Sequence, residues 1–201
     1  MRTTDGDSPT RQKLLEAAQE LMLAKGFTAT SVDEVCAAAG VTKGSFFHYF
    51  DSKEHLGRVV AEHYFAAKKR QCQAAPFWRK KDPLDRIYGF VDSLIELPHT
   101  AEAGKGCLLG TFVQELSETH PAIRAVCAAC LAEQAAAFKR DLDEAKARYA
   151  AGARWDTQSL AEHLLAVVQG AIILAKAKQD PKVIGESAKH FKEYLKGLFG
   201  R

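Results

Sequence analysis

Residues 30–53 read TSVDEVCAAAGVTKGSFFHYFDSK, and this stretch decides the fold. Its segment Ser31-Val-Asp-Glu34 has the pattern of a capping box, in which the serine and the glutamate satisfy free backbone amides at the start of a helix. After this short helix, Gly40 supplies the positive φ that a sharp reversal needs, and a second helix follows through Phe50. Two short helices joined by so tight a turn predict a helix-turn-helix.

The second helix carries side chains that suit contact with DNA. Thr42, Lys43 and Ser45 are donors near its start, where the free backbone amides also favour phosphate. Gly44 has no side chain and therefore permits close approach to a base edge or a phosphate. In a helix-turn-helix the second helix enters the major groove and the first braces it across the backbone. The ten residues from 41 to 50 hold one base and no acid, which fits that task.

The aromatic run Phe46-Phe-His-Tyr-Phe50 has two interpretations. Taken alone, it favours a core helix or a buried aromatic strand, because aromatic side chains usually pack inside proteins. In a helix Phe46 and Phe50 share the inward face, which leaves the three residues between them elsewhere. Exposing three such groups is costly unless something covers them. DNA would do so, with Phe47 against a thymine methyl group and Tyr49 on a phosphate.

Helical signals also dominate the rest of the chain. No stretch shows sustained alternation with period two between hairpin turns, and proline or a capping residue precedes most of the amphipathic segments. The sequence therefore predicts an all-α fold with no sheet and nine helices, at approximately 9–25, 32–39, 42–50, 52–75, 83–97, 108–118, 121–151, 157–178 and 182–199.

Composition limits the class of protein. The 201 residues carry a net charge of only +3, and residues 1–60 hold seven bases and eight acids, so DNA contact would depend on a few placed groups. Five cysteines without regular spacing favour reduced thiols in a cytoplasm. We expect no signal peptide and no membrane partner, because the uncharged apolar run 164–175 is shorter than the ~20 residues of a bilayer span.

Signals for catalysis and metal binding are weak. We find no nucleophile with a base and an orienting group, no phosphate-binding loop and no metal motif. Cys127 and Cys130 lie three residues apart within one helix and lack a second ligand pair. We therefore expect no metal, no cofactor and no enzymatic activity. An enzyme and a helical adaptor that does not bind DNA remain the alternatives. Only the surface of residues 42–49 favours a DNA-binding protein over the adaptor.

A resemblance to a known family rests on residues 10–56, TRQKLLEAAQELMLAKGFTATSVDEVCAAAGVTKGSFFHYFDSKEHL. This segment resembles the TetR family of transcriptional regulators in the order of its elements, the Gly-Val turn, the aromatic second helix and the following Ser-Lys-Glu. The family most often has tyrosine in place of Phe47, so one hydroxyl contact to phosphate is absent here. The resemblance implies that Thr30 or Ser31 caps the bracing helix and touches phosphate, and that the operator is faced by Thr42, Lys43, Gly44, Ser45, Phe47, His48, Tyr49 and Lys53.

The same resemblance implies a function and a domain organisation. A DNA-binding domain over residues 1–56 would precede a helical effector-binding and dimerisation domain over 57–201. The last two helices would form the homodimer contact, although an ordinary monomer core is the alternative interpretation of these apolar segments. A dimer would place two recognition helices about 34–36 Å apart, one turn of DNA, on a near-palindromic operator. We expect a transcriptional repressor that a small-molecule effector releases.

The effector site is predicted around the segment Gly106-Cys107-Leu108-Leu109-Gly110, which follows a loop and opens a helix. A helix start stabilises a thiolate, and a subgroup of the family with Gly-Cys-Leu here includes members that sense electrophiles or oxidants. Cys107 would then react with the effector or contact it; the alternative is a small packed hydrophobic side chain. The other residues that we expect at this site are Phe112, Phe138 and Gln169.

Overall fold

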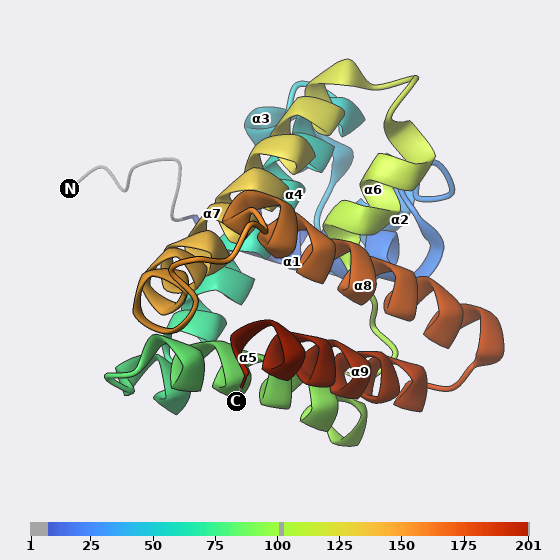
Figure 1. Ribbon diagram of the computed structural model, residues 1–201. Helices are drawn as coiled ribbons and strands as arrows, with labels where there is room; N and C mark the ends of the chain where they lie inside the picture. The colour runs from blue at the N-terminus through green and yellow to red at the C-terminus, as the bar shows by residue number, and fades with distance from the viewer. Residues whose placement is uncertain (1–7, 101–102, 201) are drawn as a thin grey trace. The chain divides into compact units, whose positions relative to one another are not determined.

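The computed structural model describes residues 8–100 and 103–200. These residues form nine α-helices, two short 3-10 helices and no strand, which confirms the predicted fold class (Figure 1). The α-helices are α1 (Pro9–Lys25), α2 (Val32–Ala39), α3 (Lys43–Tyr49), α4 (Lys53–Gln73), α5 (Pro83–Glu96), α6 (Leu108–Leu116), α7 (Pro121–Tyr149), α8 (Thr157–Lys178) and α9 (Lys182–Phe199); the 3-10 helices are η2 (Pro76–Arg79) and η3 (Leu97–His99).

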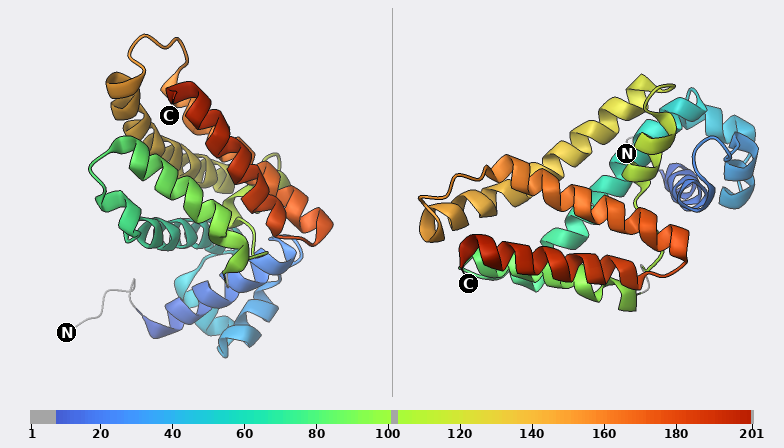
Figure 2. Two further views of the ribbon diagram at one scale, coloured as in Figure 1. Left: turned by 60° about the horizontal axis from the view of Figure 1, so that its bottom comes forward. Right: turned by 45° about the vertical axis from the view of Figure 1, so that its right-hand side comes forward.

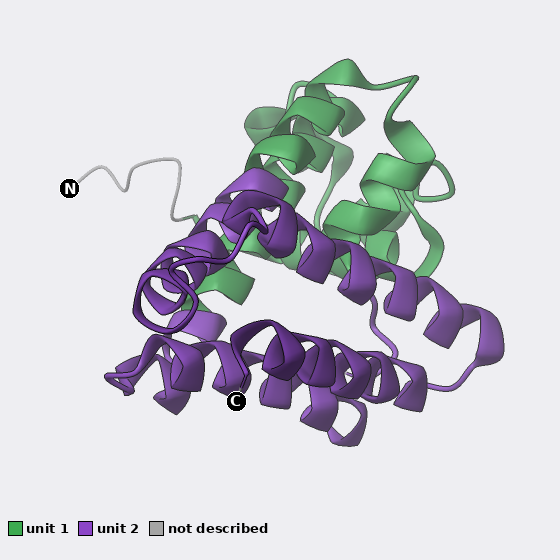
Figure 3. Cartoon of the chain, in the orientation of Figure 1, with its two compact units in different colours: residues 1–70, 107–130 green, residues 71–106, 131–201 purple. Residues whose placement is uncertain are grey.

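The chain divides into two compact units (Figure 3). Unit 1 comprises residues 1–70 and 107–130, and unit 2 comprises residues 71–106 and 131–201. Unit 1 thus holds the helix-turn-helix together with α6 and the first third of α7, which come much later in the chain. The domain boundary at 56/57 stays a prediction.

The core of unit 1 forms where α1 packs against α2, α3 and α6. Phe27 and Phe112 meet edge to face with their ring centroids 5.9 Å apart, a favoured arrangement of aromatic rings. Gly57 of α4 lies so close to Phe27 that an added Cβ would be 2.7 Å from its ring. Only glycine allows this approach. The largest fully buried side chains of unit 1 are Leu14, Leu15, Met22, Phe46, Phe50, Leu56, Leu108, Leu109, Phe112, Leu116 and Ile123.

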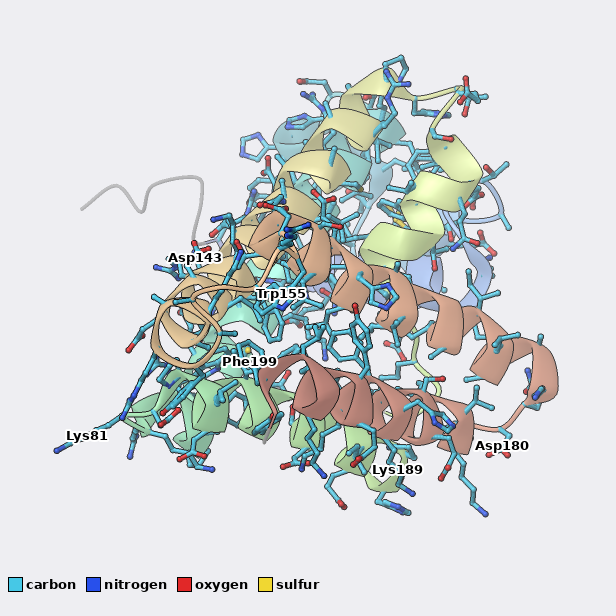
Figure 4. All side chains as sticks on the ribbon, viewed as in Figure 1. Lys81, Asp143, Trp155, Asp180, Lys189 and Phe199 are labelled. Atoms are coloured by element: carbon cyan, nitrogen blue, oxygen red, sulfur yellow. The ribbon has the colours of Figure 1, made fainter. Side chains whose placement is uncertain are left out.

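In unit 2, α9 packs against both α5 and α8, and the two views of Figure 2 show the three helices side by side. At the end of α9, Phe199 meets Trp155 with the ring centroids 5.2 Å apart (Figure 4). One continuous cluster of buried side chains fills the space between the helices: Leu84, Ile87, Val91, Ala135, Phe138, Leu142, Ala145, Leu160, Ala161, Leu164, Ala188, Phe191, Leu195 and Phe199.

Ion pairs between distant parts of the sequence reinforce unit 2. Arg86 of α5 lies 2.7 Å from the Asp141 carboxylate of α7 and also binds Glu144. The side chains of Arg86 and Asp141 are only 15% and 14% exposed, so water screens this pair less than it screens a surface pair. The network fixes α5 against the second half of α7.

Two helices, α7 and α8, have the length and mean hydropathy of a membrane span. The expectation of no membrane partner rests on the uncharged run 164–175, which is only part of α8. Both helices contribute to the core of unit 2, where Leu142 of α7 and Leu164 of α8 belong to the buried cluster.

Candidate nucleic-acid interface

The first helix of the helix-turn-helix starts at the predicted capping box. The Ser31 hydroxyl accepts a hydrogen bond from the Glu34 amide, and the Glu34 carboxylate accepts one from the Ser31 amide. Lys25 also binds this carboxylate, and its hydrogen bond together with those from Ser31 lowers the pKa of Glu34 to about 2. The Glu34 carboxylate therefore stays ionised well below neutral pH, and its bond to Ser31 fixes the start of α2.

Gly40 makes the turn between α2 and α3, as predicted. Its φ of +66° and ψ of +36° lie in the left-handed region, which side chains other than that of glycine adopt only at a cost. An added Cβ would have no neighbour within 4 Å, so backbone strain alone selects glycine. Thr42 then caps α3, because its hydroxyl accepts the Ser45 amide at 3.2 Å.

Helix α3 has two different faces. Phe46 and Phe50 are 0% and 1% exposed, with their ring centroids 5.6 Å apart. Phe47 is 56% exposed, the largest value among the exposed large hydrophobic side chains of the described residues. The outer face also presents Thr42, Lys43, Gly44 and His48. The structure thus supports the helical interpretation of the aromatic run and leaves Phe47 exposed to solvent.

Asp33 of α2 lies next to the outer face of α3. The Lys43 ammonium is 2.7 Å from the Asp33 carboxylate, and the two side chains are 60% and 67% exposed. The hydrogen bond and the charge of Asp33 raise the pKa of Lys43. A pair this exposed is weak, so a phosphate can replace the carboxylate at little cost.

Thr30 and Lys53 were predicted to contact DNA, and both side chains contact the protein itself. Thr30 is 1% exposed and its hydroxyl donates to the Gly26 carbonyl at 2.7 Å; the cap of α2 is Ser31 and not Thr30. Lys53 donates to the Thr28 carbonyl at 3.3 Å, with its ammonium 4.4 Å from the centroid of the Phe27 ring. Burial lowers the pKa of Lys53. Both residues shape the segment that precedes α2.

Tyr49 is half-buried, and its hydroxyl forms a 2.7 Å hydrogen bond with Ser8, the residue that precedes α1. The adjacent His48 ring packs on the Tyr49 ring with the centroids 4.7 Å apart. The tyrosine hydroxyl has one donor hydrogen, which can bind a phosphate oxygen when Ser8 is the donor in the bond between them.

The four predicted effector residues are divided between the units. Cys107 precedes α6 as its N-cap and is half-buried, and Phe112 is 0% exposed in the core of unit 1. Phe138 is 5% exposed in the core of unit 2, and Gln169 is half-buried on α8. The pocket that these four residues would share remains a prediction.

Three residues at this surface were not identified from the sequence: Ser8, Asp33 and Glu115. Glu115 of α6 accepts hydrogen bonds from the Phe27 and Thr28 amides, across 88 and 87 residues of sequence. No periodicity or local motif marks such a contact. The Asp33–Lys43 pair spans a turn, and helix spacing alone does not predict it either.

The geometry defines the class of protein. A capped helix, a left-handed glycine and a second short helix with an acid-free outer face form a helix-turn-helix of the kind that binds DNA. Residues 14–58 match the family model described as "Bacterial regulatory proteins, tetR family". Residues 83–191 match the family model described as "Tetracyclin repressor-like, C-terminal domain". The second match covers more than half of the chain. The protein belongs to the TetR family of transcriptional regulators.

Two curated relatives agree with this assignment. The chain is 29% identical to the HTH-type transcriptional repressor DhaR of Mycobacterium sp. (strain GP1), over 86% of this chain and 85% of that protein. It is 31% identical to the transcriptional regulator AcuR of Cereibacter sphaeroides, over 85% of this chain and 78% of that protein. Both names describe regulators of transcription.

Solved structures share the fold along nearly the whole chain. The regulatory protein TetR from Rhodobacter sphaeroides superposes with a TM-score of 0.82 at 29% identity, over 93% of this chain and 99% of that one. The TetR-family regulator from Cytophaga hutchinsonii gives a TM-score of 0.85 over 100% of both chains. That second pair is only 18% identical, so it supports the fold alone.

Proposed function

We propose that the protein represses transcription in the bacterial cytoplasm by binding a near-palindromic operator as a homodimer, and that a small molecule releases it. The observation that carries the proposal is the outer face of α3. Two phenylalanines anchor this helix in the core, while Lys43, Gly44, Phe47 and His48 face solvent beside a capped turn. The family membership and the printed name of DhaR, a transcriptional repressor, support repression.

DNA contacts in this proposal divide into two kinds. Thr42, Lys43, Ser45 and Tyr49 supply hydrogen bonds and charge to phosphates and to base edges. Phe47 supplies an apolar surface for a thymine methyl group, and Gly44 allows the helix to approach closely. Asp33 holds Lys43 in the free protein and releases it to the DNA. Thr30 is left out because its hydroxyl is buried, and Lys53 contributes by shaping the segment before α2.

The test is a titration of labelled DNA from the region upstream of the gene, followed by fluorescence anisotropy at several salt concentrations. Affinity should fall steeply with salt, because each neutralised phosphate adds about 0.9 to the slope of log K against log salt. Lys43→Ala should lower affinity about tenfold and reduce the slope by about 1. The matched control is Lys189→Ala, on the exposed side of α9 (Figure 4). Absence of wild-type binding at low salt would sink the proposal.

The homodimer contact is proposed at the α8–α9 face, which comprises Ala166, Gly170, Ile173, Leu174 and Tyr194. Ile173, Leu174 and Tyr194 are 46%, 50% and 48% exposed, and the α8 members recur at helical spacing along one side. Three large exposed apolar side chains on one face favour a partner surface. A second copy would pair this face with itself about a twofold axis and bring two copies of α3 to one operator.

For the effector, we propose that Cys107 is the reactive group. Burial raises the pKa of the Cys127 thiol to about 12 and also raises the pKa of the Cys36 and Cys72 thiols, which keeps these three protonated and poorly nucleophilic. Cys130 is buried as well, whereas Cys107 is half-buried and, unlike the half-buried Cys72, lies at the start of a helix. N-ethylmaleimide should therefore weaken DNA binding of the wild type and leave Cys107→Ser unaffected. Cys72→Ser is the control and should lose DNA binding on treatment as the wild type does. If N-ethylmaleimide weakens the DNA binding of Cys107→Ser as much as that of the wild type, the assignment is contradicted.

A further inference from the structure

The segment between α1 and α2 is held by two oppositely charged side chains. The Glu115 carboxylate accepts hydrogen bonds from the Phe27 amide at 2.8 Å and from the Thr28 amide at 2.7 Å. Lys53 donates to the Thr28 carbonyl and lies over the Phe27 ring. Both backbone polar groups of Thr28 are thus bound by charged side chains, an arrangement that we call the loop clamp.

The loop clamp lies directly before the helix-turn-helix. Thr28 precedes Ser31, the N-cap of α2, by only three residues. The α-carbon of Gly26, a residue with φ of +87°, packs against the Glu115 carboxylate. A Cβ added at Gly26 would lie only 2.8 Å from Glu115 Oε2. The clamp therefore fixes the path of the chain from the end of α1 to the start of α2, and it does so from α6.

Glu115 remains ionised at neutral pH. Partial burial raises its pKa, but the hydrogen bonds from Thr28 and Phe27 and the charge of Lys53 outweigh burial and lower it overall. Hydrogen bonds from backbone amides to an ionised carboxylate are stronger than those to a neutral acceptor. Two such bonds at 2.7–2.8 Å need a carboxylate, because an amide side chain offers one oxygen and turns a donor toward the second N–H.

We propose that Glu115 is a positioning residue for operator binding: it fixes the orientation of α2 and α3 by holding the Phe27 and Thr28 amides. This inference rests on the proposed function. Without the clamp, the helix-turn-helix would sample several orientations, and the DNA would have to order it on binding. Because only the ordered fraction binds, apparent affinity falls by that fraction.

The variant Glu115→Gln tests the proposal with little change in shape. Operator affinity should fall about tenfold if one molecule in ten keeps the binding orientation. Amide hydrogen exchange at Phe27 and Thr28 should become faster, while exchange in the core of unit 2 stays the same. The melting temperature checks the fold, and affinities are compared at a temperature at which both proteins are fully folded. Glu118→Gln is the matched control, an exposed acid in the turn that follows the same helix.

Each outcome is decisive. Faster exchange at both amides with a tenfold loss of affinity, and no change in Glu118→Gln, supports the positioning role. Faster exchange with unchanged operator affinity makes the clamp structural only and overturns the inference. An equal loss in Glu118→Gln attributes the effect to net charge and overturns it as well. If the wild type itself fails to bind operator DNA, the proposed function fails instead, so the two failures are distinguishable.

Discussion

The helix-turn-helix of unit 1 and the α8–α9 face of unit 2 acquire their exposed surfaces in different ways. In the helix-turn-helix, the bonds that cap the helices and close the turn join residues within five positions of each other: Ser31 to Glu34, Gly40 to Cys36, and Thr42 to Ser45. The α8–α9 face depends on the packing of α9 against α8 and α5, and the ring centroids of Tyr194 on α9 and His163 on α8 are 5.6 Å apart. Local bonds thus form the two short helices and the turn of the recognition surface, whereas long-range packing decides which apolar side chains of the α8–α9 face stay exposed.

Replacement of Phe112 by alanine tests whether local bonds suffice for the helix-turn-helix. Phe112 is fully buried against Phe27 in unit 1, and truncation of a buried phenylalanine costs about 3–5 kcal/mol of unfolding free energy. We expect a loss of this size in urea denaturation. Phe47→Ala, at an exposed position of α3, is the control and should change stability by less than about 0.5 kcal/mol. A small effect of Phe112→Ala would mean that α6 is not needed for the stability of unit 1.

The variant Gly170→Arg tests the α8–α9 face without touching the core. An added Cβ at Gly170 has no neighbour within 4 Å, and replacing a glycine within a helix favours the helix by up to about 1 kcal/mol. The fold should therefore be kept while a charged side chain blocks the dimer contact. Sedimentation should show monomers, and operator affinity should fall about 100-fold or more because the second half-site is lost. Gly152→Arg, which also has open space, is the control; a dimeric Gly170→Arg would place the interface elsewhere.

The recognition surface is tested by Gly44→Ala. A Cβ at Gly44 would meet only Thr42 Oγ1, at an ordinary contact distance of 3.6 Å, so the free protein accommodates the methyl group. Melting temperature should stay level or rise, while operator affinity falls about tenfold because the methyl group prevents close approach. Stability and binding would thus change in opposite directions. Unchanged binding would show that DNA does not approach Gly44.

The smallest expected effect comes from Phe47→Tyr. The added hydroxyl would restore the phosphate contact expected of the family, and one extra hydrogen bond should strengthen binding about threefold. Phe47 is 56% exposed, so the hydroxyl needs no rearrangement of the core. Anisotropy titration against the same operator DNA measures the change. Weaker binding would instead indicate that Phe47 lies in an apolar contact that rejects a hydroxyl group.

Local signals made much of the fold predictable. Proline, capping residues and helical periodicity gave all nine helices, with bounds that differ from the structure by a few residues, as at the end of α4 and of α7. The turn at Gly40 and the burial of Phe46 and Phe50 were also predicted. The contacts of the Thr30 and Lys53 side chains were not predicted, because the resemblance gives the positions of these residues along the chain and not the groups that they contact.

The sequence by itself determined the helix-turn-helix, because caps, a left-handed glycine and an acid-free second helix act over a few residues. It also determined the family through residues 10–56. Only the tertiary structure decided that Glu115 binds the loop before α2 and that Asp33 holds Lys43. It likewise decided that Phe112 lies in the core of unit 1. The physical reason is that a single carboxylate or aromatic ring carries no periodic signal, so its partner is known only once packing has brought distant segments together.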